Sequence, residues 1–316
     1  MKVYYSEKGN VPELKSSIVA IGIFDGVHKG HAKIIGRAVD AAKKGRSKSV
    51  VITFDPHPRC IVGKNVCPGT LISLNHRIAL LGSLGVDIVV VVHFTKTFAG
   101  LTPAAFVGRY LASRLRADQV FVGKNYRFGK DGSGDALMLR ELGKKFGFVA
   151  RVIPSVVDSG KIVSSTLIRG AISSGELDAA SRMLGRRVSV LGTVIHGLKR
   201  GRGLGFPTSN IDPHHEVIPP SGVYAVRVRV RGTVYGGVMN IGSRPTFETG
   251  GEPAVEVHIF DFRKDIYGVD IEAYFIKKLR EERKFKIRGD LIRQIGEDSR
   301  IARKVLTGSR WAFPCL

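Results

Sequence analysis

The chain has 316 residues, of which 43% are hydrophobic and 24% are charged, a composition typical of soluble globular proteins. This length predicts two domains, because single hydrophobic cores stop growing at about 250–300 residues. The first residues lack the apolar stretch of a secretory signal, and the most apolar run, 88–92, is too short to span a bilayer. Neither a secreted nor a membrane-spanning protein is therefore expected.

The three cysteines, Cys60, Cys67 and Cys315, form an odd set without metal-ligand spacing. This usage is typical of a reduced protein, so we predict a cytoplasmic location. Pairing of Cys60 with Cys67 is one alternative, but we expect two free thiols in a loop.

Fifty lysines and arginines against 27 acidic residues give a net charge of +23. A basic surface attracts polyanions, which makes an RNA-binding protein an alternative to an enzyme. The basic residues are dispersed along the chain, however. Arg227, Arg229 and Arg231 alternate, so they are predicted to share one face of a strand, and most other basic runs are expected to be solvated faces. Nucleic acid is therefore not expected as a partner.

Apolar runs and helical patterns alternate in the first half of the chain. Strands are predicted at 18–24, 50–54, 88–94, 120–122 and 149–153, with helices at 31–44, 75–84, 103–115 and 135–146 between them. Continuous apolar strands that alternate with helices are typical of a parallel sheet with helices on both faces. Ligands of such sheets bind beyond the carboxyl ends of the strands.

The first strand ends in G-I-F-D-G-V-H-K-G-H, residues 22–31. Gly26 and Gly30 flank His28 and let the backbone approach a ligand closely. His28 and His31 stand where the strand turns into a helix, and the amino-terminal end of a helix attracts phosphate. The pattern H-x-G-H therefore indicates nucleotide chemistry, with a packed or capping histidine as the alternative.

Two further polar turns follow predicted strands. T-F-D-P-H-P, residues 53–58, presents His57, and V-G-K-N-Y-R-F-G spans 122–129. Three such turns at strand ends predict one converging site. Downstream, hydroxyls in V-S-S-T-L-I-R, residues 163–169, open a predicted helix with Arg169 one turn in. N-capping and a second phosphate cradle are compatible roles for them.

The pattern changes after a short helix at 176–184. Alternating strands are predicted at 188–194, 223–230, 234–241, 255–260 and 271–275, and a helix at 289–305. These elements predict an antiparallel barrel or sandwich with a C-terminal helix. The predicted domains are 1–185 and 186–316.

A glycine-rich basic loop, 196–205, precedes F-P-T-S-N in this second domain. Its glycines and cations suit a triphosphate, although an ordinary mobile loop is the default for such a sequence. The loop lacks Walker A spacing. Thr208 and Asn210 are neutral oxygen donors two residues apart, which can ligate Mg²⁺ together with phosphate oxygens.

The order of these motifs with G-V-M-N-I-G-S-R-P-T-F and V-E-V-H-I-F-D-F resembles the bifunctional bacterial FAD synthetases, which combine riboflavin kinase and FMN adenylyltransferase. The resemblance covers nearly the whole chain. It implies an α/β Rossmann-like nucleotidyltransferase domain followed by a six-stranded antiparallel β-barrel riboflavin-kinase domain with a C-terminal helix. The kinase would convert riboflavin to FMN with ATP and Mg²⁺. The transferase would join FMN to the AMP of a second ATP, giving FAD and pyrophosphate.

The resemblance also implies residue roles. His28 and His31 would contact ATP phosphates, Glu256 would be the general base, and Thr208 and Asn210 would bind Mg²⁺ and ATP. Residues implied to bind nucleotide, flavin or phosphate are Gly22, Phe24, Asp25, Gly26, His57, Asn125, Arg127, Ser164, Ser165, Thr166 and Arg169 in the first domain, and Gly197, Lys199, Gly203, Gly205, Pro207, Thr208, Asn210, Asn240 and Arg280 in the second. The stretch 279–285 resembles the family's flap over the flavin. Ala32 and Tyr126 depart from the family pattern, in which glutamine and phenylalanine are common.

Strand position alone does not distinguish a catalytic Glu256 from an outward surface carboxylate; the resemblance decides between them. A single-activity nucleotidyltransferase with a regulatory second domain remains an alternative, which the intact P-T-S-N and Glu256 set argues against. The expected partners are the small-molecule substrates, and the expected state is a monomer or a weakly self-associating chain.

Overall fold

The computed structural model describes residues 1–6, 11–63, 67–196, 206–215, 217–243, 253–285 and 287–308. Two compact units divide the chain. Among the described residues, unit 1 is formed by Met1–Gly69 and Leu74–Ser165, and unit 2 by Thr70–Ser73 and Thr166–Gly308. The boundary at 185/186 remains a prediction. None of the described helices is long and apolar enough to cross a membrane.

Unit 1 is built on a parallel six-stranded sheet with strand order β1-β4-β3-β2-β5-β6. Its strands are β1 (Lys2–Tyr5), β2 (Ser17–Ile21), β3 (Lys48–Asp55), β4 (Ile88–His93), β5 (Ala117–Gly123) and β6 (Val149–Ile153). Its helices are α1 (Lys29–Lys44), α2 (Pro58–Val62), α3 (Leu74–Ser83), α4 (Lys96–Ala99), α5 (Pro103–Phe106) and α6 (Ala136–Phe146), and α5 runs on into a π-helical stretch, Val107–Arg114. A 3₁₀ turn, Lys130–Gly132, and a small hairpin of β7 (Val157–Asp158) and β8 (Lys161–Ile162) complete the unit.

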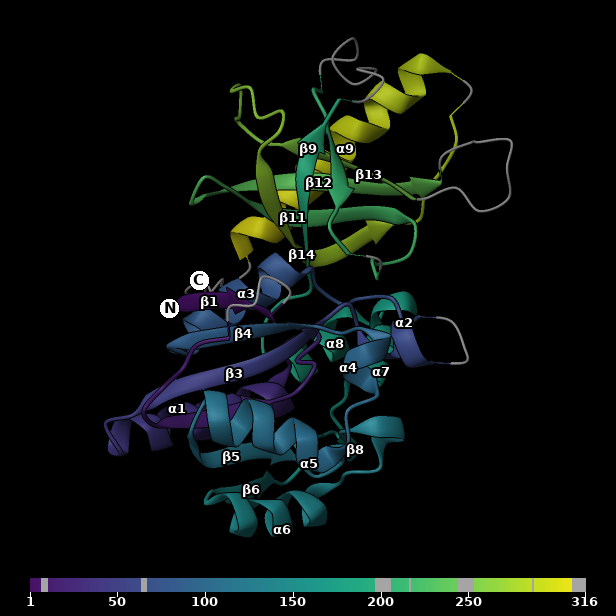
Figure 1. Ribbon diagram of the computed structural model, residues 1–316. Coiled ribbons are helices and arrows are strands. Elements are labelled where there is room, and N and C mark those ends of the chain that lie inside the picture. The colour runs from purple at the N-terminus through teal and green to yellow at the C-terminus, as the bar shows by residue number, and fades with distance from the viewer. Residues whose placement is uncertain are drawn as a thin grey trace. The chain divides into compact units, whose positions relative to one another are not determined.

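Helices cover both faces of this sheet, as predicted (Figure 1). α1 packs against β2, β3 and β5. On the other face, Phe106 and Leu111 share a core cluster with Val19 and Val50 of the sheet. The five predicted strands and four predicted helices are confirmed. β1, α2, α4 and the β7–β8 hairpin were not predicted, because each is too short to show a period.

Unit 2 contains a closed antiparallel barrel with strand order β10-β13-β12-β11-β14-β9. The strands are β9 (Ser189–Ile195), β10 (Ser209–Pro213), β11 (Gly222–Val230), β12 (Thr233–Ser243), β13 (Pro253–Ile259) and β14 (Asp270–Arg280), and the helices are α7 (Ser165–Ser173), α8 (Leu177–Leu184) and α9 (Arg288–Gly308). α9 packs on the outside of the barrel through Ala302 and Leu306, against Ala225 and Phe260 (Figure 1). The barrel alternative is therefore confirmed and the sandwich alternative is wrong.

Arg227 and Arg229 share one face of β11, as predicted, and both are half-buried, whereas Arg231 lies beyond the strand in an exposed turn. Arg227 Nη2 donates to the Leu306 carbonyl of α9 at 2.7 Å. Arg229 Nη2 donates to Glu272 Oε2 at 2.9 Å, and the Tyr274 hydroxyl bonds the same carboxylate oxygen at 2.6 Å. Burial raises the pKa of Glu272, although its bonds to Ser189 and Arg229 oppose that effect. Part of the positive charge therefore stabilises the barrel wall.

The expectation of two free thiols is wrong for Cys60 and Cys67, which form a disulfide. Cys60 lies in α2, and Cys67 follows seven residues later. The spacing of the two cysteines allowed this pairing. The expectation of free thiols came from the odd number of cysteines, which suggested a protein without disulfides.

Candidate active sites

The turn after β2 carries the first histidine motif in a buried and strained backbone. Phe24 and Val27 have positive φ angles of 52° and 38°, and Gly26 has a φ of 81°. A left-handed conformation at a residue other than glycine costs on the order of 1–3 kcal/mol. Phe24, Asp25 and His28 are at most 5% exposed, so packing holds the turn in this form. The strained backbone therefore lies in the same segment, residues 22–31, that carries the histidine motif in the sequence.

His28 and His31 form a stacked pair at the start of α1. His28 is the N-cap residue, and its Nδ1 accepts the His31 backbone N–H at 3.3 Å. The two ring centroids are 3.6 Å apart with an interplanar angle of 19°, and the Phe24 ring meets His31 edge-on. A Cβ at Gly30 would lie 3.1 Å from His28 Cε1. Capping and phosphate binding are therefore compatible, because an Nδ1 that accepts the cap hydrogen bond makes Nε2 the protonated nitrogen of the neutral ring.

Hydrogen bonds from β3 and from the first residue of α7 support this turn. Thr53 Oγ1 donates to the Ile23 carbonyl at 2.8 Å, and Ser165 Oγ donates to the Asp25 carbonyl at 3.0 Å. A Cβ at Gly22 would lie 2.9 Å from the Phe24 ring, so this position needs glycine. The serine of S-S-T-L-I-R thus contacts the F-D-G turn directly, and unit 1 ends at this residue.

Arg77 of α3 is a buried cation that the sequence analysis missed. It is 2% exposed, and its Nη1 donates to Thr53 Oγ1 at 3.2 Å and to the Phe54 carbonyl at 3.0 Å. Burial lowers its pKa, whereas the charges of Asp25 and Asp55 raise it. Arg77 therefore neutralises two carboxylates at the carboxyl end of the sheet. The sequence could not predict this role, because an arginine within a helical pattern is normally expected on the exposed face.

Replacing Arg77 by methionine is expected to destabilise the protein by about 3–5 kcal/mol, because a buried carboxylate then loses its compensating charge. Denaturant unfolding followed by circular dichroism measures the loss. Arg109 is exposed in the same unit, and its replacement by methionine should change stability by no more than about 0.5 kcal/mol. Equal effects of the two substitutions would contradict a special role for Arg77.

The other two predicted turns follow strands that flank β2 directly, β3 and β5. After β3, a cis Asp55–Pro56 peptide leads to His57, which caps α2 by accepting the Arg59 N–H on Nδ1 at 3.1 Å. After β5, Asn125 is exposed, and Arg127 lies 3.7 Å from the Asp135 carboxylate. Since β3, β2 and β5 are parallel neighbours, the three turns lie at one edge of the sheet, as predicted.

Tyr126, the departure from the family pattern, stacks on Phe128 with ring centroids 5.4 Å apart. Its hydroxyl is buried without a hydrogen-bond partner among the described residues, and burial raises its pKa. The ring therefore extends the aromatic cluster of unit 1. Nothing in the structure explains the preference for a hydroxyl here.

Unit 2 brings three of the predicted residues into one row. Asn210 of β10 is the register partner of Glu256 of β13, and Glu256 is in turn the partner of Asn240 of β12. Side chains of directly opposed residues lie roughly 5 Å apart at Cβ. The strand neighbours of this row, Ile211 and Met239 among them, are buried on the opposite face. A carboxylate thus stands between two amides on one face of the barrel wall.

The start of β10 is held against β13. His258 Nδ1 is 2.9 Å from the Pro207 carbonyl, and the Phe206 ring packs edge-on against His258. This contact fixes the approach of the chain to Thr208 and Asn210. Four residues predicted to bind nucleotide, Gly197, Lys199, Gly203 and Gly205, lie outside the described residues.

Four further residues predicted to bind substrates lie outside the histidine turn and the Asn210–Glu256–Asn240 row. Ser164 precedes α7, and Thr166 and Arg169 lie in its first turns on the unit 2 side of the boundary. Arg280, at the end of β14, is bound by Asp298 of α9 through three N–O contacts of 2.8–3.1 Å. The Arg280 guanidinium is therefore already engaged by protein groups.

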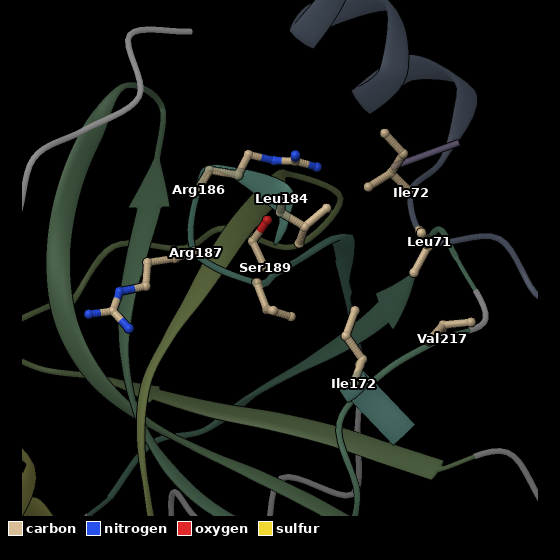
Figure 2. A pocket seen from close by; sticks show the side chains of 9 residues that line it. Leu71, Ile72, Ile172, Leu184, Arg186, Arg187, Ser189 and Val217 are labelled. Carbon is tan, nitrogen blue, oxygen red and sulfur yellow. The ribbon is translucent and has the colours of Figure 1, made fainter. Parts of the chain in front are cut away.

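A pocket in unit 2 contains none of the predicted site residues. Leu71, Ile72, Ile172, Leu184, Arg186, Arg187, Val188, Ser189 and Val217 line it. Figure 2 shows Leu71, Ile72 and Val217 along one side, with the Arg187 guanidinium pointing away on the other. The Ser189 hydroxyl is bonded to Glu272 at 2.7 Å. The pocket therefore lies apart from the residues predicted to bind substrates.

Known proteins match both units. A family model described as FAD synthetase matches residues 11–167, and one described as riboflavin kinase matches residues 184–306. A bifunctional riboflavin kinase/FMN adenylyltransferase of Bacillus subtilis is 37% identical over 94% of this chain and 95% of its own length. The protein of that description from Listeria monocytogenes is 40% identical over 91% and 92%.

A solved structure also matches along the whole chain. It is described as a macrolide-efflux protein from Streptococcus pneumoniae, has a TM-score of 0.82 and 31% identity, and is matched over 96% of its length and 95% of this chain.

Proposed function

The chain belongs to the family of bifunctional riboflavin kinases/FMN adenylyltransferases, and we propose that its two sites make FAD from riboflavin in two steps. The barrel site phosphorylates riboflavin to FMN. The sheet-edge site of unit 1 transfers AMP from a second ATP to FMN and releases pyrophosphate. The observation that carries this assignment is the placement of the stacked histidines and of the Asn210–Glu256–Asn240 row in two different units.

In the adenylyl transfer, an FMN phosphate oxygen attacks the α-phosphorus of ATP. That oxygen is already ionised, so the step needs alignment and charge neutralisation rather than a base. Nε2 of His28 and His31 would donate to ATP phosphate oxygens at the start of α1, where the helix dipole also favours negative charge. Asn125, at the same sheet edge, would help to hold the flavin and the nucleotide. The buried Arg77 would keep the turn in shape without touching ATP.

In the kinase step, the riboflavin 5′-hydroxyl attacks the γ-phosphorus of ATP, and ADP leaves. A hydroxyl is a poor nucleophile until its proton is removed, and Glu256 is the carboxylate that we propose accepts that proton. Asn210 and Asn240 on either side of it would hold it and the reacting oxygens by hydrogen bonds.

We propose Mg²⁺ as the metal of the kinase step, with Thr208 and Asn210 as its protein ligands. Both side chains offer neutral oxygens and are half-buried, and Thr208 lies one residue before β10, the strand that contains Asn210. Mg²⁺ in phosphoryl-transfer enzymes takes few protein ligands and is carried largely by the substrate phosphates, which fits this donor set. The metal would neutralise the charge of the β- and γ-phosphates.

Asn210→Ala is expected to raise the Mg²⁺ and ATP concentrations needed for riboflavin phosphorylation, on the order of tenfold, since one oxygen ligand is lost. The riboflavin KM should change much less. Titrations of ATP at several fixed Mg²⁺ concentrations measure the effect. Asn125→Ala is the matched control, because it removes an amide from the other unit; an equal effect on the kinase step would contradict the assignment.

We further propose a cytoplasmic enzyme that acts as a monomer or a weakly associating chain on small-molecule substrates. ATP is plentiful in that compartment. The Cys60–Cys67 disulfide is uncommon in a reducing cell, so thiol counting on freshly purified protein tests the location independently of activity.

Isotope transfer tests the assignment of two reactions. With γ-labelled ATP and riboflavin, label should enter FMN; with α-labelled ATP and FMN, label should enter FAD. A single-activity nucleotidyltransferase would incorporate only the α-label. Absence of α-label from FAD would exclude the role proposed for unit 1.

A further inference from the structure

The chain beyond β14 runs beside the row of Asn210, Glu256 and Asn240. β14 ends at Arg280, and residues 281–285 have no regular structure. A Cβ on Gly242 would lie 2.5 Å from Glu282 Oε1 and 3.4 Å from Asn240 Nδ2. One point on β12 therefore lies close to both the row and the segment 281–285, so this segment borders the row at its Asn240 end.

Arg280 fixes the start of that segment to α9. Its Nε lies 3.0 and 3.1 Å from the two Asp298 carboxylate oxygens, and its Nη2 is 2.8 Å from Oδ2. Asp298 is 3% exposed, and Gln294 Nε2 donates to its Oδ1 at 3.0 Å. A buried, bidentate arginine–carboxylate pair sets both position and orientation. Arg280 is thus fixed in position by α9, the helix that packs on the outside of the barrel.

The segment in turn folds around Arg280. Arg280 Nη1 donates to the Glu281 carbonyl at 2.9 Å, and its guanidinium lies 5.9 Å from the centre of the Phe285 ring. Lys278 Nζ bonds the Glu281 carboxylate at 2.7 Å. One guanidinium therefore connects the buried Asp298 to both ends of the segment 281–285. Loss of Asp298 would leave that guanidinium free to move and the segment without its anchor.

We propose that Asp298 is a positioning residue for riboflavin phosphorylation. It acts through Arg280, in place of the direct ligand contact predicted for Arg280 from the sequence, and holds residues 281–285 over the flavin side of the site. This inference rests on the proposed kinase function of the barrel. Asp298 touches no substrate, so its loss weakens flavin binding and leaves ATP binding and the proton transfer at Glu256 in place.

Asp298→Asn removes the charge while keeping the shape. Its riboflavin KM should rise about tenfold or more, with the ATP KM and kcat changed less than about threefold. Asp298→Glu keeps the charge and should restore part of the loss. The matched control is Asp261→Asn, because Asp261 forms the same bidentate pair with Arg303 of α9, at 2.8 and 3.0 Å, but on the exposed side. It should leave all three constants unchanged.

Limited trypsin digestion gives a second measurement that needs no activity. Arg283 and Lys284 are exposed cleavage sites within the segment. Asp298→Asn should speed cleavage there severalfold, measured by mass spectrometry, and riboflavin with ADP should protect the unchanged protein. Arg280→Lys keeps the positive charge but loses the two-pronged contact with the Asp298 carboxylate. If Asp298→Asn does not fold, Arg280→Lys should show the same faster cleavage.

Folded Asp298→Asn or Arg280→Lys protein with an unchanged riboflavin KM and an unchanged cleavage rate overturns the proposal. Equal rises of the riboflavin and ATP KM values also overturn it, because they indicate general damage to the barrel. If the unchanged protein does not phosphorylate riboflavin at all, the kinase assignment fails instead, and the digestion still reports whether the Asp298–Arg280 pair holds the segment.

Discussion

Glu256→Gln is expected to slow riboflavin phosphorylation by roughly 10²- to 10⁴-fold, the usual contribution of a general base. Glutamine keeps the shape of the side chain between Asn210 and Asn240, so the barrel wall should remain intact. Only the ability to accept the proton of the 5′-hydroxyl is lost. ATP affinity should change little, because Glu256 is assigned to the acceptor. Steady-state rates of FMN formation at saturating ATP measure the effect.

Glu282 provides the matched control, because it is another carboxylate beside Asn240. Glu282→Gln should retain kcat at saturating riboflavin to within about threefold, because Glu282 belongs to the segment proposed to lie over the flavin and takes no part in the proton transfer. FAD synthesis from supplied FMN should be normal in both variants, since that reaction belongs to unit 1. Near-normal phosphorylation by Glu256→Gln together with a large loss in Glu282→Gln would move the base to the segment after β14.

His31→Ala should lower FAD formation from FMN on the order of 10²-fold, the scale of losing one preorganised donor to a charge that develops in the transition state. The substitution also removes the ring that stacks on His28 at 3.6 Å and meets Phe24. FMN should therefore accumulate when riboflavin and ATP are supplied. Chromatography of the flavins over time gives both rates from one reaction.

The kinase rate of the His31→Ala protein is its internal control. It should equal that of the unchanged protein, because Glu256 and Asn210 belong to unit 2. A thermal unfolding curve that matches the unchanged protein excludes a folding defect of unit 1. Parallel loss of both activities in a folded protein would contradict the separation of the two sites.

The parallel sheet was predictable because its strands are long apolar runs. Every residue of β2 is buried, as is typical of a strand covered on both faces. The histidine turn was predictable for the same reason, since glycines and an H-x-G-H spacing follow such a run. β10, Ser209–Pro213, reads S-N-I-D-P and was not predicted. A single buried side chain, Ile211, gives a strand of this length no period to detect.

Contacts between residues far apart in the chain could not be predicted from the sequence pattern. Asn210, Glu256 and Asn240 come together only through the register of three strands, and register is set by nonlocal pairing. Asp298 lies in a helix 18 residues beyond Arg280, and an acidic residue there is ordinary. Arg77 likewise stands in a helical pattern, where an arginine is normally exposed. The motifs predicted which residues carry the chemistry, and only the fold shows which other residues support them.

One time course tests the central claim most directly. The protein is incubated with riboflavin as the only flavin, ATP and Mg²⁺, and the flavins and nucleotides are separated at intervals. FMN should appear first with ADP, and FAD should follow with pyrophosphate, in amounts that match the flavin consumed. Riboflavin that remains unconverted with Mg²⁺ and with every other divalent metal tested would contradict the account.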